Sequence, residues 1–532
     1  MAKGYDYVIV GGGSAGCVLA ARLTENPDVR VLLIEAGGKD DHPYIHMPVG
    51  FAKMTTGPFT WGFTTTPQKH ANNREIPYAQ ARVIGGGSSI NAEVFTRGHP
   101  ADYDRWAREE GAEGWSFAEI RKYFLRAEGN AVLSGEWHGA DGPLGVSNTP
   151  DPQKTALAFV RACQEYGMPH NADFNGPSQE GAGIYQTTTR NKRRCSAAVG
   201  YLKPALSRPN LTIELGCLVN RIVFAGNRAT GVEYARGGQM QLAEATSEVI
   251  LTAGAIGSPK MLMLSGVGPA AQLKQHGIAV VHDLPGVGEN LNDHFGIDIV
   301  AELNNHDSLD KYKKLHWMAW AGIQYYLFGS GPVTSNVVEG GAFWYADKNA
   351  PIPDLQFHFL AGAGAEAGVP SVPQGSSGIT LNSYTVRPKA RGTVRLRSAN
   401  PADAPLIDPN FLGHPDDLKT SVEGVKISRE IFNQPSLQKL IRAVHFPAAS
   451  VKTQTDFEDY ARQYGRTSYH PTCTCKMGTD AMAVVDAQLR VRGLERLRIC
   501  DSSTMPSLIG SNTNAPTIMI AEKASDLIRG NR

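Results

Sequence analysis

The segment YHPTCTCKMG at residues 469–478 holds three side chains whose types and spacing could do chemistry. His470 precedes Cys473 and Cys475 by three and five positions, which is compatible with a metal site, a redox pair or a general base. The cysteines are closer together than a usual zinc pair, they lack the C-x-x-C spacing, and no second ligand cluster is apparent in the sequence. We therefore expect no bound metal, two buried packing cysteines and one active residue, His470.

The first forty residues contain another spacing with chemical meaning. A β-branched run ending at Val10 leads into a glycine turn, a helical pattern and a buried strand that ends at Glu35. This order is the βαβ unit that binds dinucleotides, with the pyrophosphate at the helix N-terminus and the acid on the adenosine ribose. The cofactor-binding residues predicted from this unit are Gly11, Gly13, Ser14, Ala15, Gly16, Glu35 and Ala36.

Residues 12–16 also fit G-x-S-x-G, the nucleophile elbow of serine hydrolases, which likewise lies between a strand and a helix. An elbow at Ser14 would have no preceding strands to supply an oxyanion hole, and it would leave Glu35 without a role. We therefore favour dinucleotide binding and keep a Ser14 hydrolase as the alternative from a different class.

Two later stretches favour a cofactor larger than a nicotinamide. ARVIGGGSSINAEVF (81–95) contains a second glycine turn, where main chain could approach another part of a large cofactor. VILTAG (249–254) has the pattern of a buried strand, and GAIGSPKMLMLSGVG (254–268) that of a helix between turns. We expect this strand to lie in the same sheet as the βαβ unit and to end near the cofactor.

These stretches carry a family resemblance. Residues 85–95 and 254–268 resemble the two signature motifs of the glucose–methanol–choline (GMC) oxidoreductases, which are FAD enzymes. Residues 484–528 resemble that family's closing segment, so the similarity covers essentially the whole chain. Within the family, the sequence is most similar to bacterial FAD-dependent L-sorbose dehydrogenases, notably in IHMPVGFAKMTTGP (45–58), NAEVFTRGHP (91–100) and HPTCTCKMG.

The resemblance implies an α/β protein of the GMC fold. It would have a Rossmann-like FAD-binding domain and a substrate-binding domain made of a sheet and helices, both assembled from discontinuous segments. The FAD-binding domain is expected from 1–155, 205–300 and 476–532, and the substrate domain from 156–204 and 301–475.

Alcohol oxidation sets the requirements for the catalytic residues. It removes a hydroxyl proton and a hydride from the same carbon; a flavin can take the hydride, and the protein must take the proton. Histidine suits this task because its unperturbed pKa lies near neutrality. The resemblance implies that His470 is the base and that Asn512, the first Asn of SNTNAP, is its partner. The Asn512 amide could donate to the substrate oxygen as it becomes an alkoxide.

The resemblance also transfers cofactor contacts onto this sequence. Beyond the N-terminal unit, the implied contacts are Gly86, Gly87, Asn91, Ala92, Val94, Val219, Asp501, Asn514 and Pro516. Some family members attach FAD covalently through a histidine immediately before the Asn of the second glycine motif. Ile90 occupies that position here, so we expect non-covalent FAD.

Substrate selection has weaker signals. Glu339 and His358 are polar residues in apolar strand patterns, and Trp61 lies in a loop that could cover the site; each could equally serve packing. The resemblance implies oxidation of L-sorbose to L-sorbosone. The alternatives are a GMC dehydrogenase or oxidase of aliphatic, aromatic or polyether primary alcohols, and a hydroxynitrile-lyase-like protein without redox turnover. A quinone or a dye-like compound is compatible as electron acceptor, and no oligomeric state is predicted.

The bulk composition limits the partners and the compartment. Lys+Arg 52 against Asp+Glu 51 gives no electrostatic case for nucleic acid or an anionic membrane, so RNKRR (190–194) is expected to be a solvated surface turn. No export signal pattern opens the chain, and seven scattered cysteines fit a reducing compartment. We expect a cytoplasmic protein, with peripheral attachment to the inner face of the membrane left open. LHWMAWAGIQYYLF (315–328) is too short to span a bilayer and is expected to be a buried helix rather than an interfacial anchor.

Overall fold

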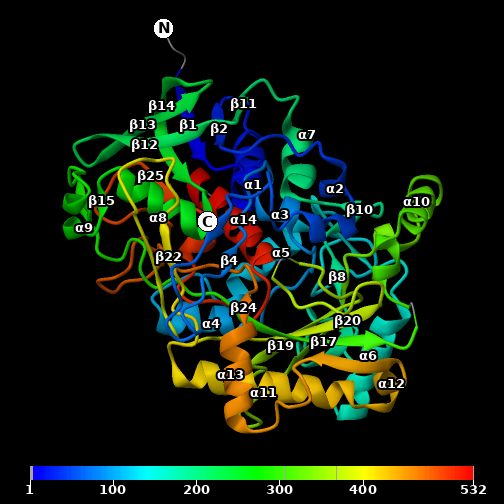
Figure 1. The fold of residues 1–532 in the computed structure, drawn as a ribbon. Helices are drawn as coiled ribbons and strands as arrows, with labels where there is room; N and C mark the ends of the chain where they lie inside the picture. The colour runs from blue at the N-terminus through cyan, green and yellow to red at the C-terminus, as the bar shows by residue number, and fades with distance from the viewer. Residues whose placement is uncertain (1–3, 306, 367, 531–532) are drawn as a thin grey trace.

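The computed structural model describes residues 4–305, 307–366 and 368–530, and two seven-stranded sheets organise these residues (Figure 1). The first sheet has a parallel part, which ends in an antiparallel ribbon of two strands. In order, its strands are β11 (Leu211–Leu215), β2 (Val31–Glu35), β1 (Tyr5–Val10), β14 (Gln239–Leu251), β13 (Arg228–Arg236) and β12 (Leu218–Ala225), with β25 (Leu497–Ile499) beside β14. Every residue of β2 is buried, as expected for a parallel strand covered on both faces.

The first and last helices of the chain lie side by side on this sheet. α1 (Ser14–Leu23) connects β1 to β2, and α14 (Asn514–Arg529) packs against α1 and against α5 (Phe117–Ala127). An ion pair of 2.8 Å between Arg22 on α1 and the buried Glu522 on α14 joins the two helices. The beginning and the end of the chain therefore build one domain together.

The second sheet is antiparallel and lies below the first in Figure 1. In order, its strands are β23 (Ile441–Phe446), β17 (Phe295–Leu303), β20 (Gly378–Thr385), β19 (Leu355–Leu360), β18 (Val338–Trp344) and β7 (Gly181–Ile184), with β24 (Arg466–Thr467) beside β17. The helices that contact this sheet are α6 (Lys154–Tyr166), α11 (Pro415–Phe432) and α13 (Gln454–Tyr464), which lie beneath it in the same view. Residues of β18, β19 and β20 line the cavity that the first domain also borders.

Two predicted domain boundaries are placed too late in the chain. The boundary at 300 falls inside β17, all of whose pairing partners belong to the second sheet. The boundary at 475 also comes late, because Cys473 and Cys475 are buried in the core of the first domain. The chain passes between the domains through buried segments here, so no glycine- or proline-rich linker marks the crossings.

Two surface predictions need correction. Residues 315–328 form α10 (Leu315–Ile323), which continues into the helical turn η4 (Gln324–Phe328), and this helix is exposed rather than buried. A helix that is buried in its own chain and a helix that is exposed on the surface can have the same apolar composition. The sequence alone therefore could not show which of these the segment forms. The run 190–194 is exposed up to Arg193, whereas Arg194 is buried. Within the described residues, no helix is long and apolar enough to cross a membrane.

Candidate active site

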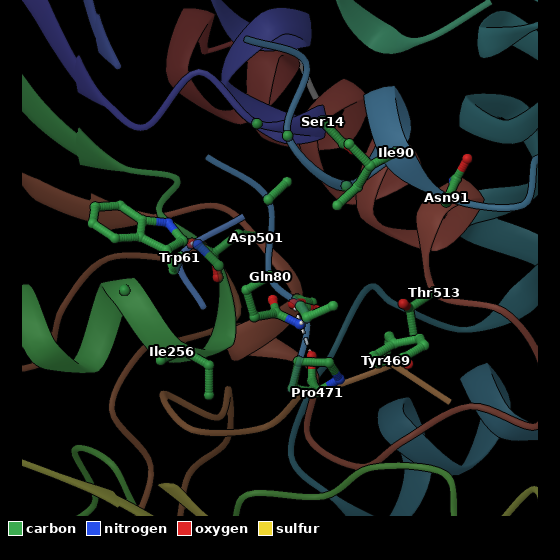
Figure 2. A pocket seen from close by; sticks show the side chains of 18 of the residues that line it. Ser14, Trp61, Gln80, Ile90, Asn91, Ile256, Tyr469, Pro471, Asp501 and Thr513 are labelled. Carbon is green, nitrogen blue, oxygen red and sulfur yellow. Dashed lines mark hydrogen bonds between the residues drawn. The ribbon is translucent and has the colours of Figure 1, made fainter. Parts of the chain in front are cut away.

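A cavity of about 360 Å³ lies between the two domains and gathers most of the predicted site residues. Figure 2 shows side chains from the first glycine unit, the second glycine turn and the C-terminal segment around it. The predicted residues that line it are Gly11, Gly13, Ser14, Ala15, Glu35, Ala36, Trp61, Gly86, Gly87, Asn91, Ala92, Val94, Val219, His358, His470, Asp501, Asn512 and Asn514. Gly16, Glu339 and Pro516 lie outside this lining.

The first glycine turn leaves a helix N-terminus open toward the cavity. Gly13 caps α1 without a side-chain hydrogen bond, and the first turn of α1 carries no acid. The leading N–H groups of α1 and the positive end of its dipole are therefore available to an anion. A Cβ on Gly16 would lie 2.0 Å from the carbonyl oxygen of Gly11, so this glycine lets α1 pack onto the turn. Glu35 accepts from the main-chain N–H of Gly12 at 2.7 Å, and burial raises its pKa.

The second glycine turn packs directly onto the first. The N–H of Gly85 donates to the carbonyl oxygen of Gly12 at 2.7 Å. At Gly86, which has a φ of 54°, a Cβ would lie 2.6 Å from the Cα of Gly13. A Cβ on Gly87 would meet no atom within 4 Å, so main chain borders open space there. Two glycine turns thus form one cradle without side chains.

Arg194, which belongs to the run expected to be a solvated surface turn, is buried and contacts the segments beside this cradle. Arg194 donates through Nε to the carbonyl oxygen of Ile45 at 2.6 Å, and through Nη1 to the carbonyl and side-chain oxygens of Asn91 at 2.7 and 2.8 Å. Its charge faces Glu93 at 3.4 Å, and burial raises the pKa of Glu93 to about 7. Arg194 closes a basic run whose earlier members are exposed, and nothing in that pattern marks its last position as buried.

Side chains near the C-terminus complete the cofactor wall. Asp501 accepts from the N–H of Gly254 at 2.9 Å and from Ser258 Oγ at 2.5 Å, and so holds the start of α8 (Gly254–Leu264). Ser14 Oγ donates to Asn514 Oδ1 at 2.8 Å, which joins the N-termini of α1 and α14. Ser14 is thus bonded to an amide and not to a histidine, which is the wrong partner for a hydrolase nucleophile. The glycine cradle, the open N-terminus of α1 and the carboxylate of Glu35 at the end of β2 fit a dinucleotide.

His470 and Asn512 face one another in this cavity. His470 Nε2 lies 3.2 Å from Asn512 Nδ2, and His470 Nδ1 lies 2.9 Å from Nδ1 of His294. His294 Nε2 lies 2.9 Å from the carbonyl oxygen of Val386. A carbonyl only accepts, so His294 carries its proton on Nε2 and offers a bare Nδ1 to His470. His470 therefore holds its proton on Nδ1, and its Nε2 lone pair accepts from the Asn512 N–H, a contact that a substrate hydroxyl could replace.

Both histidines are neutral in this environment. Burial lowers the pKa of His470 well below its usual value, with a further lowering from His294, and burial lowers the pKa of His294 to about 3. Asp293 fixes the backbone at His470, because its carboxylate accepts from the N–H of His470 at 2.8 Å and from Tyr78 Oη at 2.6 Å. The preceding Tyr469 has a φ of 63°, a strained value for a residue with a side chain. The His470 ring is thus placed by a rigid segment.

The orientation of the Asn512 amide is also fixed by neighbours. Its Oδ1 accepts from Thr96 Oγ1 at 2.9 Å and from Gln356 Nε2 at 3.0 Å. Two donors on the oxygen leave the NH₂ group to face His470. Thr96, Gln356 and His294 were not predicted, since each acts through a contact between distant parts of the chain.

The remaining wall of the cavity is mainly apolar. Its large apolar side chains are Phe51, Trp61, Phe63, Ile90, Ile256, Val338 and Leu360, and its polar groups on the second sheet and the following loops are His358, Asn382, Glu366, Arg466 and Ser468. Trp61 is half-buried and stacks on Phe63, with the Arg82 guanidinium 4.8 Å from its ring centre. Burial lowers the pKa of His358 to about 3, so this residue is a neutral hydrogen-bonding group.

Glu339 has a different surrounding from the one proposed for it. It is fully buried in β18, where it accepts from the N–H of Gln153 at 2.6 Å and from Ser335 Oγ at 2.5 Å. Burial raises its pKa to about 7. These contacts describe a satisfied core group, away from the cavity wall.

The two cysteines of the opening segment are buried in the first domain, and burial raises the pKa of the Cys473 thiol to about 12. Both are therefore protonated thiols that pack against the core. Among the residues that the structure describes, no cluster of three or more His, Cys, Asp or Glu side chains could hold a metal ion.

The fold and this site define a flavin-dependent oxidoreductase with a two-domain α/β architecture. Residues 5–296 and 388–521 match the two models of the GMC oxidoreductases, and the chain belongs to this family. It is 43% identical to an alcohol dehydrogenase [acceptor] of Pseudomonas putida, covering 98% of this chain and 95% of the relative. It is also 43% identical to the mitochondrial choline dehydrogenase of Homo sapiens, covering 99% and 90%.

Solved structures agree with this assignment. Pyridoxine 4-oxidase from Mesorbium loti is 30% identical, with a TM-score of 0.90 over 99% of this chain and 100% of that one. Formate oxidase of Aspergillus oryzae RIB40 is 26% identical, with a TM-score of 0.93 over 100% and 99%. The cofactor is FAD, and the protein is an oxidoreductase that acts on CH–OH groups.

Proposed function

We propose that the protein is a dehydrogenase that oxidises primary alcohols with an apolar chain to aldehydes, using non-covalently bound FAD. The observation that carries this proposal is the Nε2 lone pair of His470, which faces a mostly apolar cavity wall beside the Asn512 amide. Ile90 supports non-covalent binding, because it fills the position from which other family members attach the flavin. A quinone or a dye-like compound would reoxidise the flavin.

The proposed proton transfer uses groups that are already in position. His470 is neutral and accepts the hydroxyl proton at Nε2, while its Nδ1–H stays hydrogen-bonded to His294. Asn512 donates an N–H to the same oxygen as negative charge develops on it. When bound, FAD accepts the hydride from the carbon.

L-Sorbose, oxidised to L-sorbosone, is the second candidate substrate. Its support is the sequence resemblance and the polar groups His358, Asn382 and Ser468 in the cavity wall, which could bond to sugar hydroxyls. Against it stands the larger number of apolar side chains on the same wall. Choline belongs in the same comparison, because relatives at 42–43% identity are named choline dehydrogenases.

The test is anaerobic flavin reduction by the purified yellow protein. We expect straight-chain and aromatic primary alcohols to bleach the flavin faster than L-sorbose or choline. Fastest bleaching by L-sorbose would replace our proposal with the second candidate. A substrate that is consumed without any bleaching would instead indicate lyase chemistry.

The role of the base has its own prediction. His470→Ala should keep its FAD and slow flavin reduction about a hundredfold or more, the usual scale for loss of a general base. His70→Ala is the matched control, because His70 is exposed and far from the cavity wall. Near-normal reduction in His470→Ala would remove this histidine from the mechanism.

A further inference from the structure

The exposed helix at residues 315–328, here called the apolar helix, carries the largest gathering of exposed apolar side chains among the described residues. Of the seventeen large apolar side chains that are exposed among the described residues, eight belong to it: Leu315, Trp317, Met318, Trp320, Ile323, Tyr326, Leu327 and Phe328. Figure 1 shows α10 standing out at the edge of the fold. A surface of this kind normally marks an interaction site.

Basic side chains flank the apolar helix on both sides. Lys311, Lys313 and Lys314 immediately precede it, and the exposed Lys192 and Arg193 lie at its other end, where Tyr325 Oη donates to the Lys192 carbonyl oxygen. Lys313 is paired with Asp310. Lys192, Arg193 and Lys314 form no ion pair with any residue that the structure describes. The helix itself contains no charged side chain apart from a histidine at 316.

We propose that the apolar helix docks the protein on an anionic phospholipid bilayer, lying flat in the interface. Fourteen residues are too few to span a bilayer, whereas tryptophan and tyrosine are the side chains that favour the lipid–water boundary. The flanking cations then meet lipid phosphates, each adding to the attraction. The near-zero net charge of the chain hides this local patch.

A second copy of the chain is the competing occupant, and the charges argue against it. A two-fold contact places the same patch of both copies together. Because the helix has basic side chains at both ends, such a contact would bring cations of the two copies together at the rim of an apolar surface, and neither Lys314 nor Arg193 has an ion-pair partner among the described residues. An anionic surface matches these charges.

Docking here would place the cavity close to the membrane. The short helical turn η5 (Pro332–Thr334) packs against η4 and against η1 (Pro48–Lys53), and Phe51 of η1 lines the cavity. If the proposed function holds, the bilayer would supply apolar alcohols and a lipid-soluble electron acceptor to this site. Membrane binding itself does not depend on that function.

The test is co-sedimentation of the FAD-loaded protein with vesicles of phosphatidylcholine alone and of phosphatidylcholine mixed with phosphatidylglycerol. We expect binding to the mixed vesicles, at least tenfold weaker binding to the neutral ones, and a loss of binding as salt rises. Trp320→Glu with Leu327→Glu should reduce binding to the mixed vesicles at least tenfold. Lys314→Gln should reduce it about fivefold.

The control is Met240→Glu with Leu242→Glu, which changes two exposed apolar side chains on β14, outside the apolar helix, and should leave binding unchanged. Both double variants should keep wild-type flavin reduction by a water-soluble alcohol, which shows that they fold. Absence of wild-type binding, or equal binding by Trp320→Glu with Leu327→Glu, would overturn the proposal. A wild-type dimer that this variant converts to monomer would overturn it as well, in favour of a second copy. Failure of the alcohol screen alone would leave vesicle binding intact and refute only the proposed substrate.

Discussion

Replacing His294 by phenylalanine tests whether this buried ring sets the protonation of the base. Phenylalanine keeps an aromatic ring at the site but removes Nδ1, the acceptor 2.9 Å from His470 Nδ1. In the variant, His470 has two poor choices. A proton left on Nδ1 has no acceptor, and a proton moved to Nε2 points at the N–H of Asn512, 3.2 Å away, and removes the lone pair that catalysis requires.

The magnitude follows from the burial of the pair. His294 is buried and His470 is partly buried, so an unsatisfied N–H between the two rings costs about 1–3 kcal/mol. If this free-energy cost destabilises the tautomer that has the lone pair on Nε2, the rate constant of flavin reduction falls roughly 5- to 150-fold. The substrate has not reacted with His470 when it binds, so the loss should appear in the rate at saturation more than in KM.

The assay is anaerobic stopped-flow reduction, together with FAD content and thermal midpoint for each variant. His294→Asn is the matched variant, because its amide oxygen can accept from His470 Nδ1–H and restore most of the rate. A merely structural role would lower FAD content and stability in step with the rate, and Asn would bring no selective rescue. Unchanged reduction in His294→Phe, with FAD retained, would refute the tautomer argument.

Three further predictions concern other parts of the site. Gln356→Leu removes one of the two donors that orient Asn512 and should slow flavin reduction roughly 5- to 30-fold, which corresponds to a loss of about 1–2 kcal/mol. In an Asn512→Ala background the same change should have little further effect. Additive losses in this double-mutant cycle would show that Gln356 does not act through Asn512. Gly86→Ala should abolish FAD binding, measured as flavin per protein, because its Cβ would lie 2.6 Å from Gly13 Cα at a positive φ; a flavin-replete variant would contradict the cradle. Glu339→Gln should leave kcat and KM unchanged. Burial raises the pKa of Glu339 to about 7, so the stability that its protonated form contributes is fully present below pH 4.5 and is lost as pH rises to about 7. The free energy of unfolding of the variant should therefore rise by about 3 kcal/mol relative to that of the wild type between pH 4.5 and pH 7. Parallel plots of unfolding free energy against pH for the two proteins would contradict the burial argument.

Local rules explain why the cofactor cradle was predictable. Gly11 and Gly13 lie between the strand β1 and the helix α1, and Gly16 lies in the first turn of α1. The main-chain geometry of this unit depends on neighbours a few positions away. One cavity is accordingly lined by Gly11, Gly13, Ser14, Ala15, Gly86 and Gly87. The pair of His470 and Asn512 came from the family resemblance, because the 42 positions between them follow no local rule.

The supporting residues had no such signal. His294 meets His470 across 176 positions, Gln356 meets Asn512 across 156, and Thr96 meets it across 416. Each of these side chains is ordinary in its own segment, and only the packing of distant segments gives it a role. The apolar helix illustrates a different limit, since hydrophobicity gives the apolar area of a segment but not what covers it.

The joining of α1 to α14 has a consequence for how the enzyme is made. Ser14 and Asn514, which meet in the cavity wall, are separated by 500 positions. At ordinary rates of translation the ribosome needs roughly 25–100 s to pass from one to the other. During that time the first glycine turn exists without Asp501, Asn512 or α14, so the complete site forms only after these segments have been made. FAD binding then stabilises only chains that already include these segments.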